Sequence, residues 1–410
     1  MALKIIFYIY KARKYIMLSG WSRRYTMFAL LYFAQGSVLG YFTSLNALYL
    51  RSFNLTMGQI GIFSAIALSP MILKIFWGML SDKVNLLGLG HRRPYIVIGL
   101  LMQAGGQLVF PFVNPASSFS LLTAIAFFSL LGMALYDTCT DGLALDITPA
   151  EERGKVQGIM VAGRAVGVVI ISATVGLLSQ LTNWTAVFGA LAFMTVLPLP
   201  LVLLIREPAR SEGRSFNWGA FRAFGKRNVI ALGLLGMVSF MITGGTNQLV
   251  NPFLKDNYGI TYLLAGFYTA VWGIGVSLGG LTGGKLTDKI GHRRAVLGAL
   301  FTALIAILLM AVVTGPSLAW PILLFFGLAY GYYEAVFFAT SMVMTDIRIA
   351  ASMFAILMAL SNIGAGIGLA IGGRLSDLIG YRWTFAFFAC LNLLVLPLVP
   401  AIFGKKRRIT

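Results

Sequence analysis

Five ionisable residues interrupt long apolar stretches of the sequence: Lys74, Asp137, Asp141, Arg164 and Glu334. Burying such a side chain among apolar residues is costly, so each one marks a functional site or a charge pair. Carboxylates in an apolar setting can take up and release protons, and a neighbouring Lys or Arg alters that balance. The set therefore favours proton or ion binding inside a hydrophobic body.

The apolar stretches are long enough to cross a membrane. Of the 410 residues, 58% are hydrophobic and 11% are charged, with a mean hydropathy of +0.84, whereas soluble proteins carry about a quarter charged residues. A span needs about 20 apolar residues, and lipid offers no partners to backbone groups outside a helix. The sequence predicts twelve helical spans, at residues 26–50, 57–80, 94–113, 119–145, 154–178, 185–205, 229–254, 261–282, 295–314, 318–344, 350–372 and 383–403.

Four of the five charges are expected near the middle of the membrane. A helix rises about 1.5 Å per residue, which places Lys74, Asp137, Arg164 and Glu334 about 12 to 18 Å from the charged ends of their spans, near the centre of a core about 30 Å thick. Asp141 lies one turn from Asp137 on the same helix face. Two interpretations stay open: the carboxylates pair with Lys74 and Arg164 to hold the first half together, or they bind solute and protons. Glu334 has no basic residue in its own span, which favours a role in proton coupling.

The Lys and Arg residues that give the net charge of +19 are distributed unequally between the two sides of a membrane. Of 32 Lys and Arg, 26 lie in the two tails and in the connections after even-numbered spans, and four lie in the other connections. The positive-inside rule then predicts that both termini are cytoplasmic. The excess charge is expected to attract anionic lipid headgroups rather than nucleic acid.

Few residues could hold a metal or form a disulfide. Cys139 and Cys390 both fall within spans, and the two histidines, His91 and His292, lie in basic connections. We therefore expect no metal site, no disulfide framework and no cofactor.

The sequence contains a repeat at half-chain spacing. A charged hairpin occurs twice, 206 residues apart, with five extra residues inside the first copy. Each copy holds a glycine, an aspartate and two consecutive arginines: Gly78, Asp82, Arg92 and Arg93 in the first, and Gly284, Asp288, Arg293 and Arg294 in the second. The repeat extends further, because Gly61 is echoed by Gly266 and residues 176–181 are echoed by residues 373–378.

The hairpin resembles the loop signature of the major facilitator superfamily. The resemblance implies an all-α polytopic membrane protein with twelve transmembrane helices in two six-helix pseudo-repeats, which rock around a site at the membrane midplane. The expected division is a cytoplasmic tail at 1–25, bundles at 26–205 and 229–403, a cytoplasmic linker at 206–228 and a basic tail at 404–410.

The resemblance also implies roles for the hairpins. They would latch the cytoplasmic side in one of two conformers, with Asp146 and Arg153 as partners in the first half. For the four arginines the alternative is a topology marker that anchors the next helix to headgroups. In the same segment, Thr148 and Glu151 predict an N-terminal cap for the fifth span.

In the superfamily's arrangement, spans 1, 4, 7 and 10 line a central cavity. That places Asp137, Asp141 and Glu334 toward the cavity. Polar residues of spans 1 and 7 are further candidates to bind solute, with interhelical hydrogen bonds as the alternative: Gln35, Asn247 and Gln248.

The expected function is secondary active transport of a small organic solute by alternating access, coupled to protons. Lys74 and Arg164 favour an anionic or zwitterionic solute. The alternatives are a uniporter and a non-transporting membrane assembly factor on the same fold. No nucleophile, metal set or nucleotide-binding loop supports an enzyme.

The expected setting is the inner membrane of a prokaryotic cell, and the expected partners are the solute and protons, with the protein as a monomer. Residues 70–77 resemble muropeptide permeases and acetyl-coenzyme A transporters. Residues 91–95 look more like the folate–biopterin and photosynthesis-assembly branches, so no single branch is assigned.

Overall fold

The structure, a computed structural model, describes residues 20–149, 152–205, 207, 225–344 and 350–404. Most of the predicted N-terminal tail and linker, and all but residue 404 of the predicted C-terminal tail, therefore lie outside the described residues. The described residues form helices and connections, without a β-strand. This confirms the all-α fold class.

Twelve helical segments are long and apolar enough to cross a membrane, which confirms the predicted number of spans. Span 1 consists of α2 (Gly20–Tyr41), η1 (Phe42–Asn46) and α3 (Ala47–Arg51), and span 2 consists of α4 (Met57–Leu68), η2 (Ser69–Leu73) and α5 (Lys74–Lys83). Span 3 consists of α6 (Arg93–Val109) and η4 (Phe110–Phe112). Span 4 is α7 (Phe119–Ile147), span 5 is α8 (Arg153–Leu181), and span 6 consists of α9 (Trp184–Val196) and α10 (Leu199–Leu204). Spans 7 to 12 are α12 (Arg227–Tyr258), α13 (Tyr262–Ile290), α14 (His292–Ala311), α15 (Pro316–Met344), α16 (Ala350–Ile379), and α17 (Tyr381–Val395) with α18 (Leu398–Phe403). A short turn, η3 (Leu86–Gly88), lies in the first hairpin.

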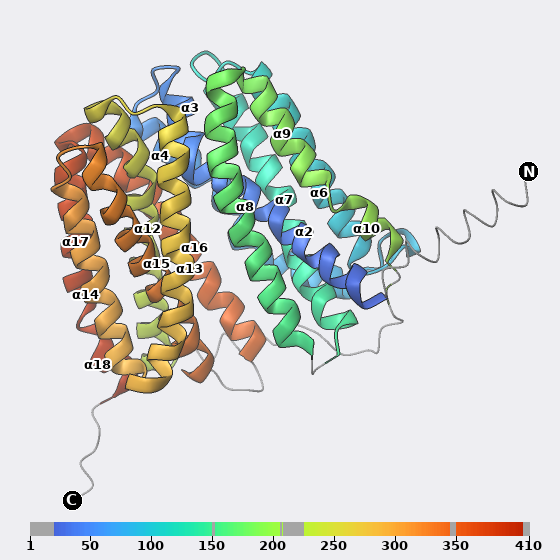
Figure 1. The fold of residues 1–410 in the computed structure, drawn as a ribbon. Helices are drawn as coiled ribbons and strands as arrows, with labels where there is room; N and C mark the ends of the chain where they lie inside the picture. The colour runs from blue at the N-terminus through green and yellow to red at the C-terminus, as the bar shows by residue number, and fades with distance from the viewer. Residues whose placement is uncertain (1–19, 150–151, 206, 208–224, 345–349, 405–410) are drawn as a thin grey trace, which may run out of the picture.

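The helices form two bundles that repeat the same packing (Figure 1). In the first bundle, α2 to α10, α2 packs on α8 and α6 packs on α7 and α9. In the second bundle, α12 to α18, α12 packs on α16 and α14 packs on α15 and α17. Between the bundles, α8 contacts α13 and α4 contacts α16. The internal repeat of the sequence thus becomes a pseudo-symmetry of the fold.

Proline sets the breaks in several spans. Pro70 stands in η2, where the second span changes from α4 to α5, and Lys74 is the first residue of α5. Pro198 and Pro397, which occupy matching places in the repeat, stand where α9 gives way to α10 and α17 gives way to α18. A proline lacks an N–H and clashes with the preceding turn, so the helix is interrupted at each point.

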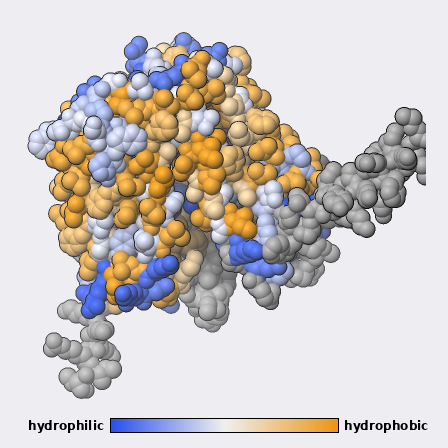
Figure 2. Space-filling view, in the orientation of Figure 1, coloured by the Kyte–Doolittle hydropathy of each residue, from blue (hydrophilic) through white to orange (hydrophobic). Residues whose placement is uncertain are grey.

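The two ends of the molecule differ. The ends of α5, α7, α13 and α18 define the basic face, at the bottom of Figure 1, and the ends of α3, α8, α12 and α16 define the opposite face, at the top. The bundles meet toward the opposite face and separate toward the basic face (Figure 1). Figure 2 shows an apolar belt around the side of the molecule and a notch between the bundles on the basic face. The chain is therefore closed at one end and open at the other.

Candidate functional site

The structure brings Lys74 and Asp137 together as an ion pair. Lys74 Nζ bonds Asp137 Oδ2, with the Asp137 side chain 3% exposed and the Lys74 side chain 33% exposed. Lys74 can reach α7 because the break at Pro70 starts a new helix at this residue. One of the two interpretations of the sequence was that the carboxylates pair with Lys74 and Arg164 to hold the first half together, and the Lys74–Asp137 ion pair fits that interpretation.

Asp141 has a different partner, which sequence reasoning missed. Its carboxylate accepts a hydrogen bond from the hydroxyl of Tyr32 on α2. Asp141 lies one turn from Asp137 on α7, so the two carboxylates and Lys74 form one cluster. The only sequence signal for Tyr32 was a phenol in the first span, which also holds Tyr41 and Tyr49.

Arg164 and Glu334 stand on different bundles and lie close enough to interact electrostatically. Arg164 belongs to α8 and Glu334 to α15, and both side chains are half-buried. Glu334 is the carboxylate that acts most strongly on the Arg164 guanidinium. Neither residue forms a direct ion pair or hydrogen bond with another described residue. Both charges are therefore without a direct counter-ion among the described residues.

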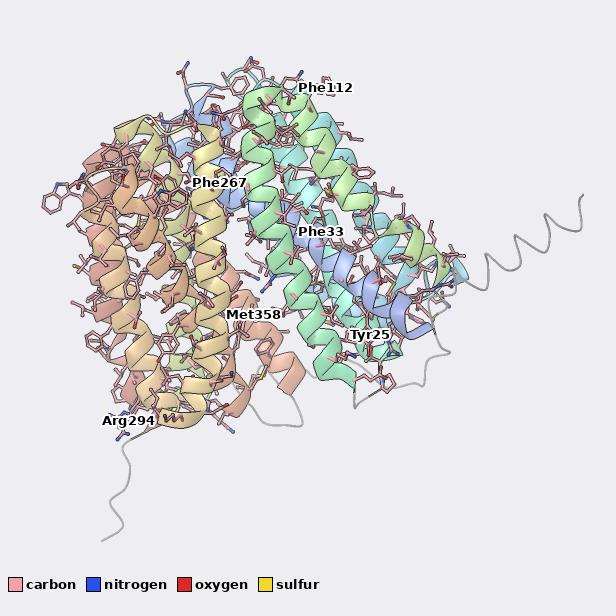
Figure 3. All side chains as sticks on the ribbon, in the orientation of Figure 1. Tyr25, Phe33, Phe112, Phe267, Arg294 and Met358 are labelled. Carbon is pink, nitrogen blue, oxygen red and sulfur yellow. The ribbon has the colours of Figure 1, made fainter. Side chains whose placement is uncertain are left out.

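Close helix packing positions Arg164. A Cβ at Gly36 of α2 would lie 2.1 Å from the backbone oxygen of Arg164, so only glycine allows α2 and α8 to approach this closely. Met358 on α16 lies toward the space between the bundles (Figure 3). The packing of α2 on α8 thus fixes where the Arg164 backbone stands relative to that space.

The three polar residues of spans 1 and 7 that were candidates to bind solute have different surroundings in the structure. Gln35 is 6% exposed, and its Oε1 has no hydrogen-bond partner in the described part of the chain. Gln248 Nε2 donates to the backbone oxygen of Leu369 at 3.2 Å, a bond between α12 and α16. Asn247 lines a small cavity of about 10 Å³ between the bundles. Gln248 is thus a packing contact here, whereas Gln35 is buried with an unpartnered oxygen and Asn247 lines a cavity.

The same cavity is lined by polar groups from three helical segments. Thr43 comes from η1, Asn251 from α12 and Trp272 from α13. Asn251 Nδ2 donates to the Ser44 backbone oxygen at 2.8 Å and so crosses from the second bundle to the first. Asn251 Oδ1 and Trp272 Nε1 are buried without a partner among the described residues. An acceptor and a donor are thus left at the cavity wall.

The first hairpin forms a charge network centred on Arg92. This side chain is 6% exposed; it bonds Asp82 and the Ser81 hydroxyl, and its Nε lies 3.2 Å from Asp146 Oδ2. Burial opposes the charge of the guanidinium, but the two carboxylates outweigh it and hold the pKa of Arg92 above its ordinary value. Arg92 therefore stays charged at physiological pH. The contacts of Arg92 with Asp82, Ser81 and Asp146 all lie inside the first bundle.

Two residues that support this network were missed from the sequence. The Glu207 carboxylate accepts backbone N–H bonds from His91 at 2.8 Å, from Arg92 at 2.9 Å and from Arg93. A Cβ at Gly142 would lie 2.4 Å from Arg92 Cζ, so this glycine makes room for the guanidinium. A lone Glu after the sixth span and a Gly beside Asp141 carried no recognisable signal.

The second hairpin is less engaged, although it matches the signature at every position. Asp288, Arg293 and Arg294 are exposed and form no ion pair with the described residues. Figure 3 shows Arg294 at the edge of the basic face. Gly78 and Gly284 have no neighbouring atom closer than 3.6 Å to an added Cβ, so neither is held here in a close helix contact. The side chain of Arg153 lies outside what the structure describes.

The predicted cap of the fifth span is wrong. α8 begins at Arg153 with Glu152 before it and without a side-chain cap. The Thr148 hydroxyl is buried and has no partner in the described residues. Glu152 instead pairs with Arg24 of α2, and Glu151 lies outside the described residues.

No group of three or more His, Cys, Asp or Glu side chains that could hold a metal ion occurs among the described residues. The site chemistry is thus that of carboxylates, a guanidinium, an ammonium and neutral hydrogen-bonding groups. These can bind protons and a charged solute.

Comparison with known proteins gives a family match. The family model described as "Major Facilitator Superfamily" matches residues 27–351. Similar proteins include the anhydromuropeptide permease of Escherichia coli (strain K12), 23% identical over 390 residues, which are 92% of this chain and 79% of the relative. Another is the folate-biopterin transporter of Synechocystis sp., 28% identical over 186 residues, which are 44% of this chain and 37% of the relative.

Solved structures agree on the fold. The nucleoside transporter NupG is similar with a TM-score of 0.77 at 13% identity, covering 94% of this chain and 99% of the other. A bacterial homolog to the human lysosomal transporter Spinster, in an inward-facing and occupied conformation, has a TM-score of 0.71 at 18% identity, covering 95% and 96%.

Proposed function

The chain belongs to the Major Facilitator Superfamily and is a membrane transporter of small solutes rather than an enzyme, and from this premise we propose that it is a proton-coupled carrier of an organic anion or zwitterion. The observation that carries the proposal is the pair Arg164 and Glu334. They stand on different bundles, interact electrostatically, and have no direct partner among the described residues.

This pair can link proton binding to anion binding. While Glu334 is ionised, it attracts the Arg164 guanidinium and competes with an anionic solute for it. Protonation removes that negative charge, so Arg164 becomes free to bind a carboxylate or phosphate, for which its planar guanidinium is well shaped. Proton and anion therefore favour each other's binding, and each can drive the other across the membrane.

The relatives add a second line of support. Their names specify anhydromuropeptides, a sialic acid and cis,cis-muconate as cargo, each of which carries carboxylate groups. A human synaptic vesicular amine transporter also matches, at 22% identity over 83% of this chain. The charge of the solute is thus the property to test first.

The test is transport in liposomes that hold the purified full chain and a trapped pH-sensitive dye. We would offer an anhydromuropeptide, a sialic acid, cis,cis-muconate, folate and an organic amine, one at a time, to wild type and to Glu334→Gln. The expected result is that one anionic solute drives proton movement in wild type. In Glu334→Gln the same solute is expected to bind or exchange without moving protons, because the amide cannot titrate.

Arg164→Gln and Asp288→Asn complete the design. Arg164→Gln is expected to raise the concentration of anion needed for half-maximal transport by about tenfold or more, since it removes a charge-assisted contact. Asp288→Asn removes an exposed carboxylate of the second hairpin and is expected to leave the number of protons moved per solute unchanged, so that a change in transport rate alone would report on the latch. Coupled transport of the amine alone would contradict the anion proposal.

If an anion is transported without proton movement, equally in wild type and in Glu334→Gln, the protein is a uniporter. Movement of none of the solutes would favour the non-transporting assembly factor. Residence in a bacterial inner membrane, both termini on the cytoplasmic side, and a monomeric state are parts of the same proposal. In that orientation the notch on the basic face opens to the cytoplasm.

A further inference from the structure

The opposite face is closed by glycines that the internal repeat carries in pairs. A Cβ on Gly373 of α16 would lie 2.1 Å from the Met57 oxygen of α4 and 3.2 Å from Gly61 Cα. A Cβ on Gly176 of α8 would lie 2.7 Å from the Tyr262 oxygen of α13 and 3.4 Å from the Cα of Gly266. The two contacts between bundles thus use matching positions of the two halves.

At one of these two contacts a carboxylate bonds the partner helix. Asp377, one turn after Gly373, accepts the backbone N–H of Met57 at 3.0 Å and of Gly58 at 2.7 Å. These are the first two residues of α4, whose N–H groups have no partners inside the helix. Thr56 caps the third N–H, at Gln59, from within the first bundle.

The matching contact lacks this feature. In the repeat, Gln180 stands where the second half has Asp377, and the Gln180 side chain is exposed. The start of α13 is capped by its own Thr261, which accepts from Leu264 at 3.2 Å. The glycine contact is therefore present twice, but the carboxylate across it only once.

A second acidic residue of this face also crosses the bundles. Asp256 of α12 pairs with Arg51 of α3 at 3.0 Å, with side chains 27% and 37% exposed. Pairs this exposed contribute little. The contact of Asp377 is of a stronger kind, because an anion meets two N–H groups and the positive end of the α4 dipole.

We propose that Asp377 is a positioning residue that locks the opposite face shut by capping α4 from the other bundle. The lock is made only when α4 and α16 touch through Gly61 and Gly373. When the bundles rock apart on this face, the two N–H groups lose their acceptor and must turn to water. Asp377 thereby favours the state that is open on the basic face, whichever solute is carried.

The experiment measures a distance across the opposite face of the full chain in lipid nanodiscs. Spin labels go on Ser117→Cys, between α6 and α7, and on Ser317→Cys, at the start of α15; both serines are exposed. The background carries Cys390→Ser, because Cys390 is exposed while Cys139 is buried. Double electron–electron resonance between the two labels then measures the populations of short and long distances, and the measurement is made in the absence of substrate.

Asp377→Ala is expected to raise the ratio of open to closed opposite face by about fivefold to tenfold, the effect of one lost helix cap. Asp377→Asn keeps an acceptor without the charge and is expected to fall between wild type and Asp377→Ala. Gln180→Asp places a carboxylate at the matching position before α13. This variant is expected to shift the ratio back toward closed when it is combined with Asp377→Ala.

Asp256→Ala serves as the matched loss of a carboxylate on the same face, with an expected shift below about twofold. Unchanged distances in Asp377→Ala would overturn the proposal, and so would an equal shift in Asp256→Ala. Because this experiment measures a distance, its result does not depend on the transport assay. The proposal for proton coupling can be contradicted while the proposal for Asp377 is supported, and the proposal for Asp377 can be contradicted while proton coupling is supported.

Discussion

At the scale of single residues, the charges within the membrane include one pair that is bonded and one pair that is not. Lys74 and Asp137 are bonded to each other inside the first bundle. Arg164 and Glu334 stand on different bundles, without a direct partner among the described residues. The first pair suits a structural role and the second suits a working site, so removing charges should have different effects in the two places.

The Lys74–Asp137 pair should show the signature of a buried ion pair. Asp137→Asn or Lys74→Met alone leaves one uncompensated charge, and we expect a loss of about 3 kcal/mol in the free energy of unfolding. The double variant Lys74→Met/Asp137→Asn should recover much of that loss, because both charges of the pair are removed and Asp141 keeps its hydrogen bond from Tyr32. Thermal unfolding of the purified protein in detergent measures both.

Asp288→Asn is the control for this series, since the Asp288 side chain is exposed; its expected effect lies within about 0.5 kcal/mol. If the losses of the two single variants simply add up in the double variant, the two residues are not energetically coupled, and the pair contributes nothing as a pair.

At the scale of elements, helix approach is controlled by glycine at the points where the bundles touch. Gly61 and Gly373 let α4 and α16 meet backbone to backbone, as Gly266 and Gly176 do for α13 and α8. An added methyl group at such a point meets a carbonyl oxygen, which cannot move aside as a flexible side chain could. The helices themselves would have to separate.

Gly373→Ala should therefore open the opposite face. Its Cβ would lie 2.1 Å from the Met57 oxygen, whereas at Gly366, on the same helix, the nearest atom is 3.9 Å away. We expect Gly373→Ala to raise the open population at least about fivefold, the low end of the cost of overpacking. Gly366→Ala should leave it unchanged. The spin-label pair at Ser117 and Ser317 measures both, and equal effects would show that alanine acts through the helix itself.

At the scale of the whole molecule, the two bundles form a carrier that is open on the basic face and closed on the other (Figures 1 and 2). The described ends of the helical body, at Gly20 and Phe403, lie on the same face, as an even number of spans requires. Lys and Arg gather on that face. The charge imbalance should therefore orient the whole molecule during insertion.

Orientation can be measured with single cysteines in a Cys390→Ser background. Lys285→Cys lies at the basic face and Ser117→Cys at the opposite face, and both parent residues are exposed. We expect a membrane-impermeant maleimide to label Ser117→Cys on intact bacterial cells, and Lys285→Cys only after the membrane is permeabilised. The reverse pattern would place the termini outside and contradict the charge rule for this protein.

The fold could be predicted almost completely from the sequence. Lipid leaves the chain little choice but helices about 20 residues long, so hydropathy alone located twelve spans. The half-chain repeat predicted two similar bundles. Even the paired glycines, Gly61 with Gly266 and Gly176 with Gly373, were visible as repeats. That they meet across the bundles, each with a member of the other pair, required the packed structure.

The site could be predicted only as a set of residues without their partners. The sequence determined which charges lie within the membrane, since composition and depth decide that. Tertiary structure decided that Lys74 bonds Asp137, that Tyr32 bonds Asp141, that Glu207 caps the start of α6 and that Asp377 caps α4. These partners lie between 63 and 320 residues apart, and short-range sequence patterns carry no information about which distant helix ends will touch. The physical reason is that the first three contacts depend on how helices pack within the first bundle, and the fourth depends on how the two bundles meet at the closed face.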